Sequence, residues 1–122
     1  MVSTYDSRAL GLAREGIFPY EKLGRPEHDD VFVTAATDIR HMRTARDLAQ
    51  RLTLLNDDGT LDLRPKIVVE FSLPRNVWIA SPVFRNNPGF VGRGRTRGGA
   101  REFVIPNLPF SALRNPKVRI VE

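Results

Sequence analysis

Residues 86–107 combine a glycine- and arginine-rich stretch with one carboxylate at the start of an apolar segment. The stretch holds five glycines and four arginines, and Glu102 directly follows the last of these arginines. A carboxylate at the start of a strand, beside a flexible loop, can be presented to a cleft. There it can act as a general base or hold a sugar hydroxyl next to an electron-poor carbon. Glu102 is therefore the first candidate for a catalytic residue, and a surface carboxylate paired with a neighbouring arginine is the alternative.

The arginines of the same stretch are candidates for binding phosphate. Arg93, Arg95 and Arg97 alternate with glycine or threonine, and a guanidinium can make two parallel hydrogen bonds to a phosphate. The stretch lacks the Gly-Lys-Ser/Thr ending of a P-loop, and no helix is predicted after it, as a dinucleotide fingerprint would require. We expect a mobile loop that contacts phosphate, with a solvated surface loop as the alternative.

Three further residues have side chains suited to chemistry or stacking. Glu70 lies on the polar side of a predicted strand, and His41 lies near the start of a predicted basic helix. Either could move a proton during RNA cleavage, and an exposed position without a role is the competing interpretation for both. Trp78 is expected in the core or in a cleft wall, where it could stack on a base or a nicotinamide ring.

The composition excludes several kinds of site. The chain has no cysteine and only two histidines, so disulfides, thiolate metal sites and multi-histidine metal sites are not expected. No apolar run has the length of a membrane span. The first residues lack the basic and apolar segments of a secretion signal. We expect neither a metal nor a membrane partner.

The charge of the chain is basic and uneven. The net charge is +5, and 16 of the 19 basic residues are arginine. Residues 1–36 hold four basic and six acidic side chains, a balance of −2, whereas residues 37–122 hold fifteen and eight, a balance of +7. This asymmetry indicates a basic face for RNA, DNA or a nucleotide, and solvated surface charge is the alternative.

The elements that must position these residues follow from apolar periodicity. The length of 122 residues predicts a single domain, residues 1–122. An apolar stripe at helical spacing predicts a helix from Asp38 to about Leu55, capped by Thr37 or Asp38. Another helix is predicted within 6–16, a helical turn between the last two strands, and strands at 31–34, 66–74, 76–80, 101–106 and 117–121. The fold class is α+β, with an antiparallel or mixed sheet of about five short strands and two helices packed against it.

Read in this order, the chain resembles the ADP-ribosyltransferase fold of bacterial polymorphic toxins. The segments that carry the resemblance are "SRALGLAREGIFP", "VFVTAATDIRHMRTARDLA", "KIVVEFSLP" and "GGAREFVIPNLPFSAL". The family begins with a strand that carries an arginine or a histidine, for which only residues 1–5 are available here.

The resemblance implies roles for particular residues. Glu102 would hold the nicotinamide-ribose hydroxyl of NAD and stabilise the oxocarbenium-like transition state, while Thr34 would brace the cleft. Arg93, Arg95 and Arg97 would lie in the loop that meets the acceptor, and we assign them to the cofactor phosphates.

The resemblance also implies a setting and leaves alternatives open. Such a toxin would be delivered as part of a larger polypeptide, act in the cytoplasm of the target cell and be inhibited by an acidic immunity protein. The competing hypotheses are a metal-independent ribonuclease toxin, with Glu70, Glu102 or His41 transferring protons, and a non-enzymatic basic module that binds RNA or protein.

Overall fold

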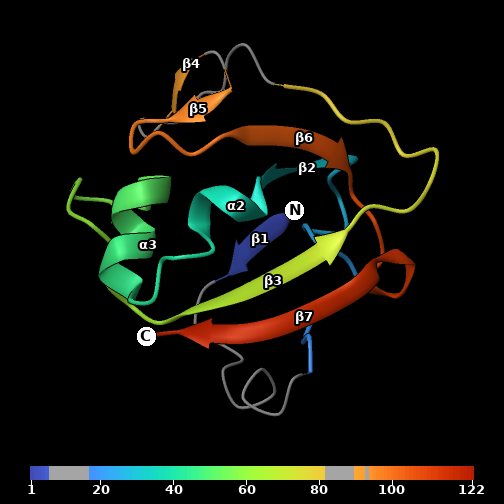
Figure 1. Cartoon of the computed structure of the whole chain (residues 1–122), viewed down its shortest axis with the longest axis horizontal. Coiled ribbons are helices and arrows are strands. Elements are labelled where there is room, and N and C mark those ends of the chain that lie inside the picture. The colour runs from blue at the N-terminus through green and yellow to red at the C-terminus, as the bar shows by residue number, and fades with distance from the viewer. Residues whose placement is uncertain (6–16, 82–89, 93) are drawn as a thin grey trace.

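A five-stranded antiparallel sheet forms the centre of the molecule (Figure 1). The structure is a computed structural model, and it describes residues 1–5, 17–81, 90–92 and 94–122. The strand order is β6-β2-β1-β3-β7. The strands are β1 (Val2–Tyr5), β2 (Asp30–Thr34), β3 (Lys66–Ser72), β6 (Glu102–Pro106) and β7 (Arg114–Val121). The expected α+β class is confirmed, while the helix predicted within 6–16 lies outside the described residues.

The first five residues form the central strand of this sheet. Val2 is the cross-strand partner of both Thr34 in β2 and Glu70 in β3. The first residues thus form a strand, and this strand contains neither arginine nor histidine. The β-branched residues of β3 suit a strand that is covered on both faces, and four successive residues from Lys66 to Val69 are buried.

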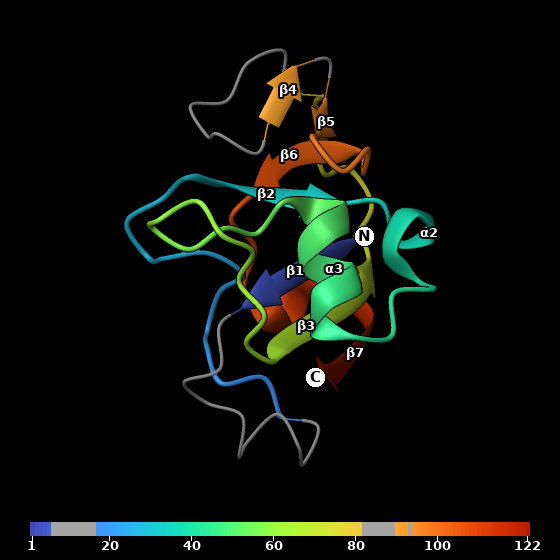
Figure 2. The same cartoon turned by 90° about the vertical axis from the view of Figure 1, so that its left-hand side faces the viewer.

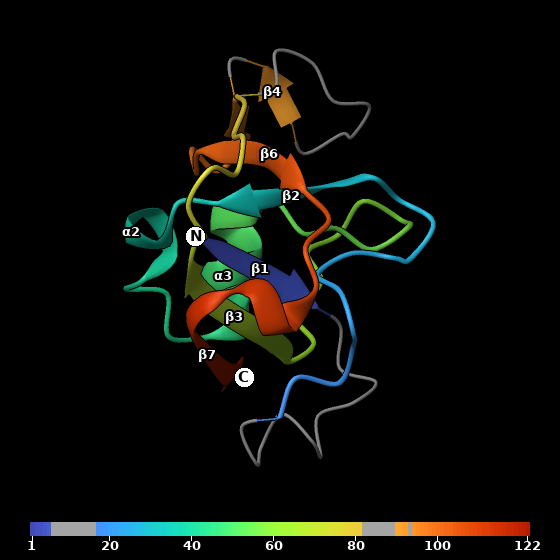
Figure 3. The same cartoon turned by 90° about the vertical axis from the view of Figure 1, so that its right-hand side faces the viewer.

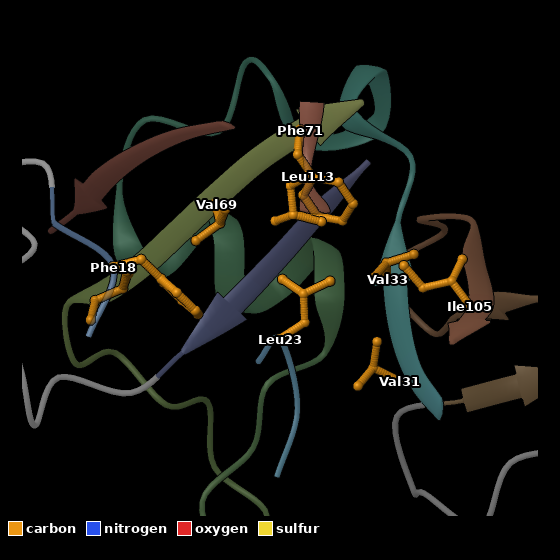
Figure 4. Close-up of a cluster of buried hydrophobic side chains, with 9 residues drawn as sticks. Phe18, Leu23, Val31, Val33, Val69, Phe71, Ile105 and Leu113 are labelled. Carbon is orange, nitrogen blue, oxygen red and sulfur yellow. The ribbon is translucent and has the colours of Figure 1, made fainter. Parts of the chain in front are cut away.

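Two apolar clusters cover the two faces of the sheet. On one face, Val33, Val69 and Ile105 pack with Phe18 and Leu23 from the segment before β2 (Figure 4). On the other face, Val2, Val68 and Val121 pack under Leu48 and Leu52 of α3 (Ala45–Leu52). Alternate residues of β3 therefore serve different clusters, which is the two-residue period of a strand.

The predicted helix from Asp38 to Leu55 is wrong as a single element. The structure has two short helices, α2 (Ala36–Ile39) and α3, separated by residues 40–44. Thr44 has an extended backbone, and its hydroxyl accepts a hydrogen bond from the Asp47 amide at 3.1 Å. This cap begins a new helix. The apolar stripe survives the break because Ile39 and Leu48 bury into the same cluster.

The remaining predictions were confirmed in part. The segment 76–80 is not a strand, and only Ala80 pairs with the sheet, through Val104 of β6. The yellow segment after β3 runs from the end of that strand to the side of β6 (Figures 1 and 3). The predicted helical turn is the 3-10 helix η2 (Phe110–Ala112).

A second small sheet pairs β4 (Phe90–Gly92) with β5 (Arg95–Thr96). Among the described residues, no helix is long and apolar enough to cross a bilayer.

Candidate functional site

One row of residues crosses the sheet from edge to edge and contains both candidate carboxylates. The strand register pairs Glu102 with Thr34, Thr34 with Val2, Val2 with Glu70 and Glu70 with Lys117. Residues directly opposite each other in antiparallel strands project from the same face. Val2 belongs to the cluster under α3, so the whole row lies on the face that carries the helices.

Thr34 and Glu102 are immediate neighbours in this row. Their strands, β2 and β6, are paired, and directly opposed residues have Cβ atoms about 5 Å apart. Thr34 is 6% exposed and Glu102 is 8% exposed. The structure therefore brings together a hydroxyl and a carboxylate that sequence reasoning had proposed separately. They form a buried polar pair at the point where β2 leads into α2.

Glu70 lies on the same face but apart from this pair. Three strand spacings of about 4.8 Å separate β6 from β3, which places the two glutamate backbones about 14 Å apart. The Glu70 carboxylate is 3.6 Å from Nε of Arg40, and its side chain is 28% exposed. His41 follows Arg40 in the connection between α2 and α3 and is exposed. Glu70 and Glu102 thus belong to two separate local environments.

An ion pair holds the residue that precedes Glu102. The amide and Nε of Arg101 donate to Oδ2 of Asp38 at 2.8 and 2.9 Å, and a second guanidinium nitrogen donates to Oδ1 at 3.1 Å. The hydrogen bonds from Arg101 keep the pKa of Asp38 below its usual range. On the following residue, the Glu102 amide donates to the Gly94 carbonyl at 2.7 Å. These contacts fix the backbone that carries Glu102.

The turn between β5 and β6 is docked on the end of α3. Arg51 donates from one guanidinium nitrogen to the Gly98 carbonyl at 3.0 Å and from Nε to the Asp38 carbonyl at 3.0 Å. The Thr96 hydroxyl donates to the Arg51 carbonyl at 2.7 Å, and the Gly98 amide donates to the Thr53 hydroxyl at 3.1 Å. The expected mobile loop is therefore, from Gly94 onward, a turn tied to a helix.

The three arginines proposed for phosphate binding have different positions. Arg95 is exposed, and its guanidinium donates to the Gly99 carbonyl at 3.0 Å. Arg97 is exposed in the docked turn, and Arg93 lies outside the described residues. Of the three arginines, Arg95 therefore uses one guanidinium nitrogen for a hydrogen bond within the turn that carries it.

Sequence reasoning missed the contacts that support the site. Asp38 was predicted as a helix cap, but its carboxylate instead binds Arg101, which is 63 residues away. No local sequence pattern predicts an ion pair between residues that lie so far apart in the chain. Trp78 was expected in the core or in a cleft wall, and its exposure of 52% excludes the core. Among the described residues, no group of three or more acidic or histidine side chains could hold a metal ion.

Comparison with known proteins shows the family to which this chain belongs. The family Ntox10, described as novel toxin 10, matches residues 14–122. The chain belongs to this toxin family. Searches of curated proteins and of solved structures gave no match. The expected polymorphic-toxin domain is supported, and membership is consistent with delivery within a larger polypeptide and suggests an immunity partner.

The matched span includes every element of the site except β1. Residues 14–122 take in Thr34, Glu70 and Glu102 together with the Asp38–Arg101 ion pair. The toxin family therefore covers the part of the chain in which the hydroxyl–carboxylate pair is built, and the chemistry of that pair decides which activity to propose.

Proposed function

We propose that this toxin domain transfers ADP-ribose from NAD to a target molecule, with Glu102 as the catalytic residue. The observation that carries the proposal is the pairing of Thr34 with Glu102 on adjacent strands, next to a central strand formed by residues 1–5. The sequence resemblance implies a hydroxyl-bearing strand and a glutamate strand around one cleft. The register supports this arrangement, since the two residues share a face.

The chemical groups of the site are of the kinds that can bind the ribose of NAD. A carboxylate beside a hydroxyl can hold the two hydroxyls of a ribose, and both groups lie in a buried setting where such hydrogen bonds are strong. β1 contains neither arginine nor histidine, so a cation for the pyrophosphate has to come from another element. Among the residues that the structure describes, Arg40 is a candidate for this cation, because it contacts Glu70 on the same face of the sheet.

Each side chain has a defined task in this proposal. NAD supplies the glycosidic bond and nicotinamide as the leaving group. Glu102 accepts a hydrogen bond from the nicotinamide-ribose hydroxyl and stabilises the positive charge that develops on the sugar carbon. Thr34 braces the carboxylate from the adjacent strand. The Asp38–Arg101 pair and the docked turn hold the Glu102 backbone, so the carboxylate needs little reorganisation.

The test is NAD turnover by the wild-type domain and by Glu102→Gln. Released nicotinamide is quantified by chromatography, in the presence and absence of a cell lysate that supplies acceptors. We expect Glu102→Gln to lower turnover about 100-fold or more, because removal of one preorganised stabilising group costs about that much. Glu27→Gln, in an exposed loop, is the matched control and should retain full activity. No NAD loss with the wild-type protein would refute the proposal.

A ribonuclease is the second candidate, and Glu70 is the observation that favours it. Its partly exposed carboxylate has Arg40 at 3.6 Å and Lys117 as its cross-strand partner. A base between cations can take a proton from a ribose hydroxyl while the cations hold the phosphate. The discriminating experiment incubates total RNA with the protein, with and without NAD. Cleavage that needs no NAD, and is lost in Glu70→Gln but kept in Glu102→Gln, would select this alternative.

A further inference from the structure

The segment that follows β3 has the sequence of a strand but pairs with the sheet at one residue only. Residues 76–80 read "NVWIA", and the valine, tryptophan and isoleucine at their centre favour strands. Only Ala80 pairs, and its partner is Val104 of β6. Because β2 occupies the inner side of β6, the segment borders β6 on its outer side. Figures 2 and 3 show that this is the edge of the sheet opposite to β7.

Ala80 directs both of its backbone groups toward β6. Its amide donates to the Val104 carbonyl at 3.0 Å, and the Val104 amide donates to the Ala80 carbonyl at 2.7 Å. In an extended antiparallel chain, the amides and carbonyls of the two flanking residues point to the opposite side. These flanking residues are Ile79 and Ser81, and among the described residues neither forms a backbone hydrogen bond. Their backbone groups are therefore directed away from β6 and are available to another strand.

The side chains of this segment are apolar and open to solvent. Trp78 is 52% exposed and Ile79 is 45% exposed. Successive residues of an extended chain project from opposite faces, so one added strand can supply neighbours for both side chains. Apolar side chains beside unpaired backbone groups are the features of a sheet edge to which a partner protein adds a strand.

The surroundings of this edge are cationic and adjoin the strand that carries Glu102. Residues 73–81 contain one arginine and no carboxylate. At the far end of this range, a Cβ added to Gly94 would lie 3.1 Å from the Ser81 hydroxyl oxygen and 3.5 Å from the Glu102 carbonyl oxygen. Gly94 directly precedes the exposed Arg95. A strand added at this edge would therefore have cations near both of its ends, with only the bordering segment between it and β6.

We propose that residues 77–81 are the docking edge for an acidic immunity protein, which adds one of its own strands there. The toxin family suggests such a partner. The cations at the docking edge favour a partner strand with apolar residues at its centre and acidic residues at its ends. A second copy of this chain is disfavoured, because each copy has a net charge of +5. Docking at this edge does not depend on which reaction the candidate site performs.

The test is hydrogen exchange of single amides, followed by NMR, in the free domain and in its complex. The wild-type domain is made by cell-free synthesis, and the probe is the purified product of the gene beside the toxin gene. We expect the amides of Ile79 and Ser81 to exchange at least about tenfold more slowly in the complex, because each gains a hydrogen bond. The measurement requires no catalytic activity, so its result is independent of the proposed transfer of ADP-ribose.

Four substitutions separate backbone pairing from side-chain contact. Ile79→Ala removes the side chain, and Ile79→Pro also removes the outward amide, a change that an edge position tolerates. In titration calorimetry, Ile79→Pro should weaken binding about tenfold more than Ile79→Ala. Trp78→Ala should weaken it about 30-fold, as truncation of a central aromatic side chain does. Leu63→Ala truncates another exposed apolar residue, before β3 and two strands away from β6, and should leave the affinity unaltered.

Several results would overturn the proposal. Absence of binding, or unchanged exchange at Ile79 and Ser81 in the complex, would mean that the partner adds no strand at this edge. Equal weakening by Ile79→Pro and Ile79→Ala would eliminate the backbone pairing. A free domain that sediments as a dimer with the same two amides protected would make a second copy the occupant. Circular dichroism verifies the fold of each variant, and the exchange measurement decides the question without any variant.

Discussion

Replacement of Gly98 by alanine should release the docked turn from α3. A Cβ added at Gly98 would lie 2.1 Å from the Gln50 carbonyl oxygen and 2.3 Å from the Arg51 carbonyl oxygen. A carbon–oxygen contact is normally about 3.3 Å or longer, so the turn has to move by about 1 Å. Both obstructing atoms belong to the backbone of α3 and cannot rotate away. The alanine can therefore be accommodated only if the turn leaves the helix.

The cost follows from the hydrogen bonds that cross this contact. Movement of the turn breaks the bonds from the Gly98 amide to Thr53, from Arg51 to the Gly98 carbonyl, and from Thr96 to the Arg51 carbonyl. Each is worth about 1 kcal/mol net, which gives a loss of about 3 kcal/mol. For a domain of this length, 1 kcal/mol corresponds to about 4 °C, so the melting temperature should fall by about 12 °C.

Gly59→Ala is the matched control for this substitution. Gly59 has a φ of +86° and no atom within 4 Å of an added Cβ, so its replacement adds backbone strain without a clash. That strain costs about 1 kcal/mol. Urea denaturation followed by circular dichroism compares the two variants. If Gly98→Ala lost no more stability than Gly59→Ala, the turn would not be pressed against α3, and the positioning of Glu102 by α3 would be refuted.

Three further predictions concern the contacts around the site and the core. Asp38→Asn removes the charged acceptor of Arg101 and should lower the kcat of NAD turnover about tenfold with little change in KM; an unchanged kcat would argue against a positioning role. Asp62 forms an ion pair with the buried Lys66 at 3.1 Å, and hydrogen bonds from Arg64 hold the Asp62 pKa well below its usual range. The ionised Asp62 carboxylate therefore contributes its full stabilisation above the pKa of about 3.9 that an aspartate has in the unfolded chain. This contribution declines as the pH falls below that value. Asp62→Asn should cost about 3 kcal/mol at pH 7 in urea denaturation and flatten the loss of stability between pH 4 and pH 2; an equally steep acid loss would contradict this. Asn107 binds three backbone groups of residues 24–28 through its side chain, so Asn107→Ala should cost about 2 kcal/mol in the same assay, and a cost near zero would mean that this loop is held by other contacts.

Much of the secondary structure could be predicted because it depends on local pattern. The alternation in residues 66–72 predicted β3 and the separate faces of Val69 and Glu70, and both agree with the structure. The long helix failed for a local reason as well. Thr44 caps a second helix, and a continuous apolar stripe cannot reveal that break because both helices bury the same side.

The site could be predicted only as separate residues. Thr34, Glu70 and Glu102 were chosen from the sequence for their chemistry, but their spacing along the chain gives no distance between them. The docked turn was predicted as a mobile loop because its glycines permit flexibility. Its actual anchor, Arg51, lies 47 residues from Gly98 within the helix predicted from Asp38 to Leu55.

The sequence by itself determined the fold class, the basic character and the kinds of side chain available for chemistry. Composition and two- or four-residue periodicity are sufficient for these, since they depend on each residue and its near neighbours. The tertiary structure alone decided that residues 1–5 form the central strand, that Glu102 pairs with Thr34 while Glu70 stands apart, and that Arg101 binds Asp38. The physical reason is that strand register and ion pairs across 63 residues arise from the packing of the whole chain, which no local segment specifies.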